Sequence, residues 1–208
     1  QNGHLDIVKL LIESGGSVNQ AYDTGSTPLW TACQRGHLDI VRLLIESGGS
    51  VNHAQDSGAS PLWIASQEGH LEVVKLLIES GGDVNQTDNG FSTPLHVASS
   101  KGNLDLVEFL VASGALVNEA NKNDDTPLMF AIYFDHLEVV ESLLLLIIAE
   151  DGVIDKANNF GMTPLGAAVK KGNLDIVQEL VDSGASINGE SGAIVDGIVR
   201  SHVHVAVS

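Results

Sequence analysis

The chain has 208 residues, of which 43% are hydrophobic, and this composition is typical of a folded protein that can bury a substantial core. Ten Lys and Arg residues stand against 27 Asp and Glu residues, which leaves a formal net charge of −17. That balance argues against binding to nucleic acid or to an anionic membrane surface, since both need clustered basic side chains, and it favours a basic or neutral partner.

The N-terminal segment QNGHLDIVKLLIE (1–13) reads as an amphipathic helix without the basic lead-in of a signal peptide. Because the chain does not begin with Met, we expect it to be part of a longer protein. Cys33 is the only cysteine, which leaves no disulfide framework and no cysteine-based zinc site, so we expect an intracellular, cytoplasmic protein. The apolar run LLLLIIA at 143–149 falls far short of the ~18 residues that a membrane helix needs.

Three short phrases recur in phase along the chain. GHLDIV and its variants occupy 3–8, 36–41, 69–74, 102–107, 135–140 and 172–177, at steps of 33, 33, 33, 33 and 37 residues. TPLW and its variants occupy 27–30, 60–63, 93–96, 126–129 and 163–166. VN or IN occupies 18–19, 51–52, 84–85, 117–118 and 187–188, and Ile154 and Asp155 fill this slot in the long unit. Such agreement indicates an internal repeat.

Each repeat predicts a pair of helices. A Thr or Ser before Pro supplies a capping hydroxyl at the start of a short first helix, and Gly ends that helix. A second helix with apolar residues at helical spacing follows, and Gly-Gly or Gly-Ala stops it. One pair cannot cover its own apolar face, whereas stacked pairs can, so the pattern predicts an all-α solenoid.

These phrases resemble the ankyrin repeat family, whose pattern is T-P-L-H, then Ala, then G-H-L-x-x-V, then G-A-x-V-N at a 33-residue period. The resemblance covers residues 1 to about 190 and implies an ankyrin-repeat solenoid of stacked helix-turn-helix units with β-turn tips. It gives a partial repeat at 1–21, full repeats at 22–54, 55–87, 88–120, 121–157 and 158–190, and a degenerate C-terminal cap or tail at 191–208.

The fourth full repeat has 37 residues instead of 33. Four residues inserted into a helix add roughly one turn and keep the buried face nearly in phase, so we predict a longer second helix that runs through 143–148. Its aliphatic residues either belong to the core or form an apolar knob on the outer side that docks a partner.

The resemblance implies that partners contact the turn tips and the exposed side of the first helices. In the fourth and fifth repeats these positions hold Tyr133, Phe134, Phe160, Met162, Lys122, Lys170 and Lys171. Aromatic anchors inside a polar rim are typical of interface hot spots, so we expect this set to hold an acidic-aromatic or apolar segment of a partner. Alternatively, Tyr133 and Phe134 pack into the long helix and compensate for Asp135, which replaces the glycine that ends the first helix.

Four further residues are candidates for partner binding: Trp30 and Trp63, which replace the His of T-P-L-H, and Asp23 and Asp56 at the tips. Each Trp should give up the hydrogen bonds that the family's His makes, and its ring either lines the binding groove or fills the space between repeats. His96 keeps the family residue and should have a hydrogen-bonding role.

The remaining polar residues do not predict a catalytic or metal site. His4, His37, His70 and His136 recur in one slot, which we attribute to packing at a helix start, and His202 and His204 alone make a weak metal site. We expect Cys33 to be buried and inert. Asn19, Asn52, Asn85, Asn118 and Asn188 should stabilise the turns between repeats, and the resemblance makes them candidate substrates of asparaginyl hydroxylases.

The sequence therefore predicts a non-enzymatic, monomeric scaffold or adaptor that binds a protein or peptide through the turn tips and first helices of the concave face. It predicts no cofactor, no metal, no nucleic acid, no membrane contact and no small-molecule substrate. An alternative is the ankyrin domain of a larger enzyme, channel or effector, which selects a substrate or sets its position. A third interpretation is a stable array with no dedicated partner.

Overall fold

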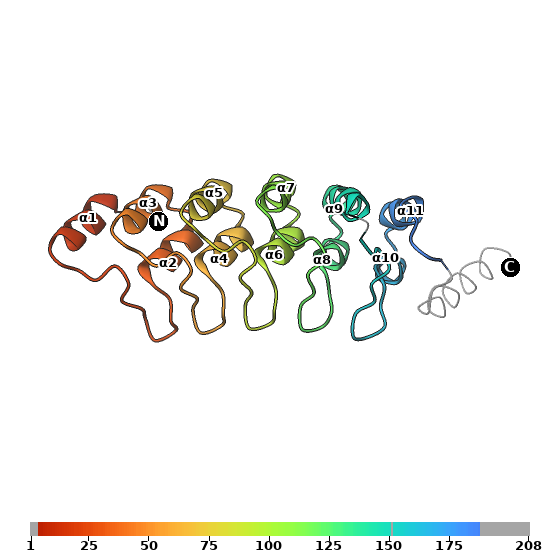
Figure 1. Ribbon diagram of the computed structural model, residues 1–208, viewed down its shortest axis with the longest axis horizontal. Helices are drawn as coiled ribbons and strands as arrows, with labels where there is room; N and C mark the ends of the chain where they lie inside the picture. Colours follow the sequence, from red (N-terminus) through yellow and green to blue (C-terminus); the bar gives the residue numbers. More distant parts are fainter. Residues whose placement is uncertain (1–3, 151, 188–208) are drawn as a thin grey trace. The chain divides into compact units, whose positions relative to one another are not determined.

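The computed structural model describes residues 4–150 and 152–187, so the predictions for Asn188, His202, His204 and the segment 191–208 fall outside the described residues. Within them, eleven helices and no strands are present (Figure 1). The first helices of the repeats are α2 (Pro28–Arg35), α4 (Pro61–Glu68), α6 (Pro94–Lys101), α8 (Pro127–Tyr133) and α10 (Pro164–Lys171). The second helices are α1 (Leu5–Glu13), α3 (Leu38–Glu46), α5 (Leu71–Glu79), α7 (Leu104–Ala112), α9 (Leu137–Ala149) and α11 (Leu174–Asp182).

The first helices begin and end where the sequence predicts. Each starts at a proline, and in α2, α4, α8 and α10 the preceding hydroxyl accepts a hydrogen bond from a backbone N–H three residues further on. Glycines in the left-handed conformation end four of these helices: Gly36 (φ 68°), Gly69 (φ 77°), Gly102 (φ 69°) and Gly172 (φ 76°). The capping hydroxyl and the terminal glycine therefore set the length of these four helices, whereas α8 ends without a glycine, at Phe134 and Asp135.

The chain divides into two compact units, and the boundary falls within α6, between Ala98 and Ser99. The first unit comprises the described residues up to Ala98 together with Asp105–Ala115, and the second comprises Ser99–Leu104 and the described residues from Leu116 on.

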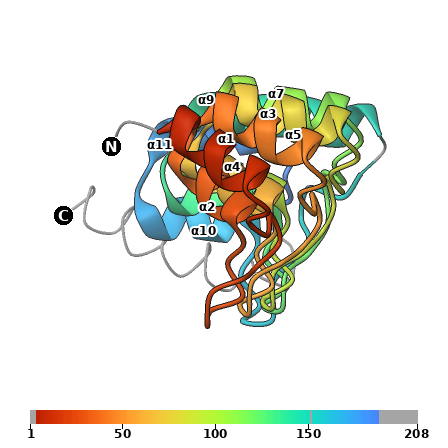
Figure 2. The same ribbon diagram turned by 90° about the vertical axis from the view of Figure 1, so that its left-hand side faces the viewer.

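In the first unit, α2 packs against α3 and α4, α4 against α5, and α3 against both α1 and α5. Figure 2 shows the first helices α2 and α4 in one layer and α1, α3 and α5 in another. In the second unit, α8 packs against α9 and α10, and α11 against α9 and α10. The predicted all-α solenoid of stacked helix pairs is confirmed.

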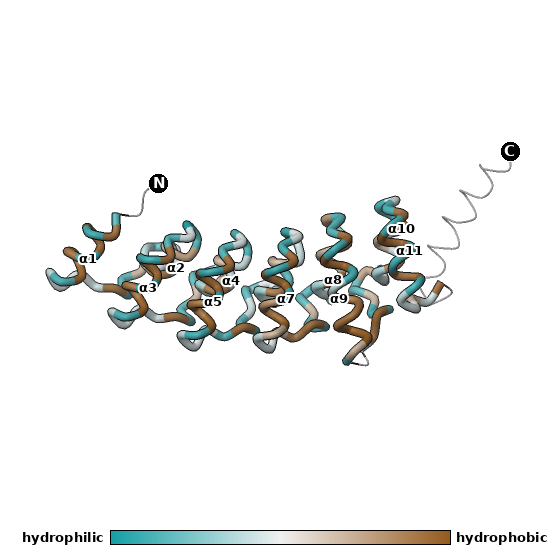
Figure 3. Tube along the Cα trace, turned by 90° about the horizontal axis from the view of Figure 1, so that it is seen from above, coloured by the Kyte–Doolittle hydropathy of each residue, from teal (hydrophilic) through white to brown (hydrophobic). Residues whose placement is uncertain are grey.

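The longer second helix of the fourth repeat is also confirmed. Helix α9 has 13 residues, compared with nine in α3 and α5, and it is hydrophobic along most of its length (Figure 3). Leu143, Leu144 and Ile147 are fully buried, whereas Leu145 is 69% and Ile148 47% exposed. The inserted turn therefore keeps the buried face in phase and adds an exposed apolar side at the end of the helix.

Hydrogen bonds join neighbouring repeats through the asparagine of the VN phrase. The Asn19 side chain donates to the Gly48 carbonyl (2.9 Å) and accepts from the Ser50 N–H (2.8 Å). Asn52 makes the same pair of bonds one repeat later, to Gly81 (2.9 Å) and Asp83 (2.9 Å). The predicted turn-stabilising role is confirmed for these asparagines.

Candidate functional site

A pocket of about 380 Å³ opens on the fifth repeat, beside the end of the fourth repeat's first helix. It lies wholly within the second unit and is lined by Tyr133, Asn158, Phe160, Met162, Ala167, Lys170 and Lys171. Five of the residues predicted from the sequence therefore come together here: Tyr133, Phe160, Met162, Lys170 and Lys171. We call this set of seven residues the repeat-five pocket.

The turn tip of the fifth repeat forms one wall of the repeat-five pocket. Oδ1 of Asn158 accepts hydrogen bonds from the backbone N–H groups of Phe160 and Met162, each at 3.0 Å. Gly161 completes this turn with a φ of 71°, a conformation that costs glycine little. The turn holds Phe160 with 75% of its surface exposed, so a large apolar side chain stands at the pocket edge in a fixed backbone.

A buried polar network lies behind the ring of Tyr133. The Tyr133 hydroxyl donates to Oδ1 of Asp125 (2.9 Å), a residue that is only 7% exposed. Nδ2 of Asn158 donates to the same carboxylate oxygen (2.8 Å) and to the Tyr133 hydroxyl (3.1 Å). Burial, together with the hydrogen bond to Asp125 and its negative charge, raises the pKa of the Tyr133 hydroxyl well above its usual range.

Asn158 was not among the residues predicted from the sequence, although it contributes to both the turn and the network. A signal for it is present, because the same slot holds Asp88 and Asn121 two and one repeats earlier. In each case the side-chain oxygen accepts from two backbone N–H groups of its own tip. Asx residues that start a turn in this way recur at turn tips, so the slot could have been recognised.

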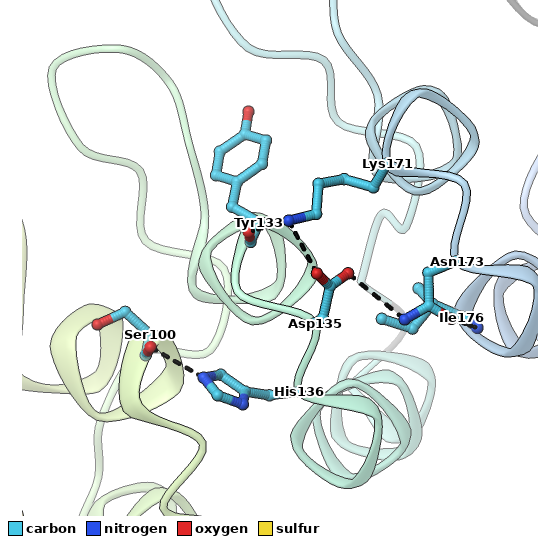
Figure 4. Close-up of polar contacts among 7 residues, drawn as sticks. All are labelled: Ser100, Tyr133, Asp135, His136, Lys171, Asn173 and Ile176. Atoms are coloured by element: carbon cyan, nitrogen blue, oxygen red, sulfur yellow. Dashed lines mark hydrogen bonds and ion pairs between the residues drawn. The ribbon is translucent and has the colours of Figure 1, made fainter.

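The two lysines of the pocket have different environments. Lys171 Nζ forms an ion pair with Oδ2 of Asp135 (2.8 Å) and donates to the Tyr133 carbonyl (2.8 Å), as Figure 4 shows. The ion pair, with a hydrogen bond from Asn173 (3.4 Å), holds the pKa of the Asp135 carboxyl below its usual range. Lys170 is exposed and has no ion pair with any residue that the structure describes. Lys171 therefore ties the fourth repeat to the fifth, and Lys170 remains available to a ligand.

Phe134 and Lys122 do not line the pocket. Phe134 follows the last residue of α8, is 57% exposed, and stacks on His136 with 6.5 Å between ring centroids. The Phe134 ring is therefore largely exposed and contacts the N-cap residue of the long helix α9, whereas the Tyr133 hydroxyl bonds to Asp125. Lys122 is exposed on the tip of the fourth repeat, where its carbonyl accepts from Asn159 Nδ2 (3.0 Å). Phe134 is therefore next to the pocket residue Tyr133 in sequence, and Lys122 bonds to Asn159 beside the pocket residue Asn158, but neither lines the pocket.

The four other predicted residues belong to the first unit. Trp30 is buried, with 7% of its surface exposed, and its indole N–H donates to the Ala59 carbonyl (3.0 Å). Trp63 is half-buried and donates to the Ser92 carbonyl (3.0 Å). We expected each Trp to give up the hydrogen bonds that the family's His makes. This expectation is wrong for bonds between repeats, because each indole N–H donates to a carbonyl of the next repeat. Asp23 and Asp56 are exposed on the tips, and none of the four residues lines the repeat-five pocket.

Two of the recurring histidines, His70 and His136, contact the preceding repeat. Nε2 of His70 lies 3.2 Å from the Gln34 carbonyl, and Nε2 of His136 lies 3.0 Å from the Ser100 carbonyl (Figure 4). The His70 ring also covers Gly36, where an added Cβ would lie 2.6 Å from a ring atom. The predicted role in helix-start packing is confirmed for these two histidines.

Other kinds of site find little support in the described part of the chain. No three His, Cys, Asp or Glu side chains of residues 4–150 and 152–187 are grouped so that they could hold a metal ion. Cys33 is fully buried, and burial raises the pKa of its thiol, so the prediction of a buried residue is confirmed. None of the described helices combines the length and the apolar character that a membrane span requires.

Family models described as ankyrin repeats match three stretches of the chain. A model of three repeat copies matches residues 1–88, a model of many copies matches 95–144, and a single-repeat model matches 160–191. No curated protein matches the chain.

Proposed function

Because the chain belongs to the ankyrin repeat family, whose repeats are general protein–protein interaction modules, we propose that it is a non-enzymatic binding module and that the repeat-five pocket is its partner site. The observation that carries the proposal is the convergence of Tyr133, Phe160, Met162, Lys170 and Lys171 around one pocket. These residues come from two repeats, and an apolar surface with a charged rim is the usual composition of a hot spot.

Hydrogen bonds fix the backbone of one wall of the pocket and the ring of Tyr133. The turn of the fifth repeat is held by both hydrogen bonds to Asn158, and the Tyr133 ring is held by its hydroxyl and by the network behind it. A surface that is already ordered loses little side-chain entropy on binding, which favours affinity.

The same network argues against a catalytic role for the pocket. The Tyr133 proton is engaged by Asp125, and the raised pKa keeps the hydroxyl neutral at physiological pH. Lys171 is engaged by Asp135. Tyr133 therefore acts as part of the wall and Lys171 as a link between repeats.

A selection from a displayed library of random peptides tests the proposal. The bait is the chain itself, compared with a variant that carries Phe160→Ser and Met162→Ser, after circular dichroism has shown that both are folded. Serine keeps the backbone N–H groups that bond to Asn158, so the turn should persist. We expect peptides that the wild type retains and the double variant does not.

Tyr22→Ser is the matched control for this selection. Tyr22 is 72% exposed, close to the 75% of Phe160, but it lies on a tip of the first unit. Its loss should leave the selected peptides bound. If the double variant retains the same peptides as the wild type, the repeat-five pocket is not the partner site.

A further inference from the structure

We infer that the repeat-five pocket takes one apolar side chain from an acidic segment of the partner, with a carboxylate of that segment paired to Lys170. This inference rests on the proposed function and names the chemistry of the partner. It follows from three properties of the pocket. The polar side-chain groups of Tyr133 and Asn158 are already hydrogen-bonded within the protein, the walls are apolar, and Lys170 at the rim has no ion pair with a described residue.

The polar groups at the inner end of the pocket are already engaged. The Asn158 amide donates to Asp125 and to the Tyr133 hydroxyl, and its oxygen accepts from two backbone N–H groups. The Tyr133 hydroxyl donates a hydrogen bond to Asp125. No side-chain donor of Tyr133 or Asn158 is left for a ligand, so a polar side chain inserted here would lose its hydrogen bonds to water without replacement.

The walls of the pocket favour an apolar occupant. Phe160, Met162, Ala167 and the ring of Tyr133 supply carbon surface on several sides. The volume of about 380 Å³ is large enough for a side chain of the size of Leu, Met or Phe. Methionine adapts its shape to the occupant, so the pocket can accept more than one of these residues.

The charge at the rim favours a carboxylate near the inserted residue. Lys170 is exposed and has no ion pair with a described residue, whereas the charge of Lys171 is offset by Asp135 at 2.8 Å. The chain as a whole carries a net charge of −17, which repels an acidic segment at long range. That repulsion is screened beyond about 8 Å at physiological ionic strength, so the nearest cation decides the preference.

An array of defined peptides tests the inference. Each peptide has a Gly-Ser background with Leu, Met, Phe or Ser at one position and Asp, Glu, Lys or Ser two to four residues away. Labelled wild-type chain is compared with the Phe160→Ser, Met162→Ser variant and with Lys170→Glu. Lys101→Glu is the matched control, because Lys101 is an exposed lysine at the end of α6, outside the pocket.

We expect wild type to bind best to peptides that combine an apolar residue with Asp or Glu. Lys170→Glu should reverse the preference to Lys, with a roughly three- to tenfold loss on the acidic peptides, because exposed ion pairs are weak. Lys101→Glu should leave the preference unchanged.

The possible failures separate the two proposals. Binding that depends on Phe160 and Met162 but shows no acidic preference, or no reversal by Lys170→Glu, overturns the inference and leaves the proposed function standing. Binding that prefers Ser at the apolar position also overturns the inference. If no peptide binds wild type above the Phe160→Ser, Met162→Ser variant, both proposals fall.

Discussion

The hydroxyl of Tyr133 donates a hydrogen bond of 2.9 Å to the carboxylate of Asp125, eight residues earlier in the same repeat. Asn158 joins the pair from the next repeat, so the inner end of the repeat-five pocket is also a connection between two repeats. A carboxylate that is only 7% exposed needs such donors, because burying a charge without partners is costly. Stability and the shape of the pocket therefore depend on the same network.

Tyr133→Phe should destabilise the protein. The substitution removes a donor from the buried Asp125 carboxylate while leaving the aromatic ring in place, and hydrogen bonds to charged groups are worth about 1.5–3 kcal/mol. Urea unfolding followed by circular dichroism measures the change. The control is Tyr22→Phe, since Tyr22 is 72% exposed, and it should change the free energy of unfolding by less than about 0.5 kcal/mol. Equal effects of the two substitutions would show that the network does not contribute to stability.

Ionisation of Tyr133 should occur at a higher pH in the folded protein than in the unfolded chain. The Tyr22→Phe variant leaves Tyr133 as the sole tyrosine, so phenolate absorbance reports it alone. The raised pKa means that the folded state favours the neutral hydroxyl. Its contribution to stability is therefore complete below the unfolded pKa of about 10 and is lost as the pH rises through the folded value. A folded-state midpoint at the ordinary value would contradict the network.

Asp135 and Asn173 should be energetically coupled. At Gly36 and Gly102 the histidine of the following repeat, His70 or His136, occupies the space that a Cβ would need. Asp135 has a Cβ at this position and a φ of 61°, and the following repeat carries Asn173 in place of His. Asn173→His alone should cost about 1–3 kcal/mol through crowding.

The double variant Asp135→Gly, Asn173→His should recover part of that loss, because it restores the glycine–histidine arrangement found at Gly36 with His70 and at Gly102 with His136. Urea unfolding of the wild type, both single variants and the double variant gives the coupling energy. We expect the double variant to be more stable than the sum of the single effects by at least about 0.5 kcal/mol. Additive effects would mean that the two positions do not influence each other.

Hydrogen exchange should be fastest at the N-terminal end of the first unit. Helix α1 has no buried residue, and its Leu10 and Leu11 are 62% and 59% exposed, whereas α5 buries Val73, Val74, Leu76 and Leu77. Few buried contacts allow local opening at little cost, so amides of α1 should exchange well before those of α5. Equal protection of the two helices would contradict this account of the array.

Most of the fold could be predicted from the sequence because its signals are local. The Thr-Pro starts, the glycine ends and the 33-residue period define the helices, and the extra turn of α9 follows from a four-residue insertion in a periodic helix. Five of the seven pocket residues could be assigned by position within the repeat for the same reason.

The details of the site depend on contacts between repeats, which a repeat-by-repeat interpretation does not supply. Asn158 bonds to Asp125 across 33 residues, and the Trp30 indole bonds to Ala59 across 29. The left-handed conformation of Asp135 (φ 61°) turns the chain after the end of α8. A non-glycine residue in that conformation is uncommon, although Asp tolerates it and Asp135 stands in the slot where the other full repeats have a left-handed glycine.

The most direct test of the central claim is a nuclear magnetic resonance titration of the isotope-labelled chain with the array peptide that pairs Leu with Asp. We expect the largest shifts at the backbone amides of Phe160, Met162 and Lys170, with small shifts at Asp23 and Asp56. The Phe160→Ser, Met162→Ser variant should show no saturable shifts with the same peptide. Shifts centred on the exposed residues Leu145 and Ile148, or on the tips of the first unit, would contradict the claim that the repeat-five pocket is the partner site.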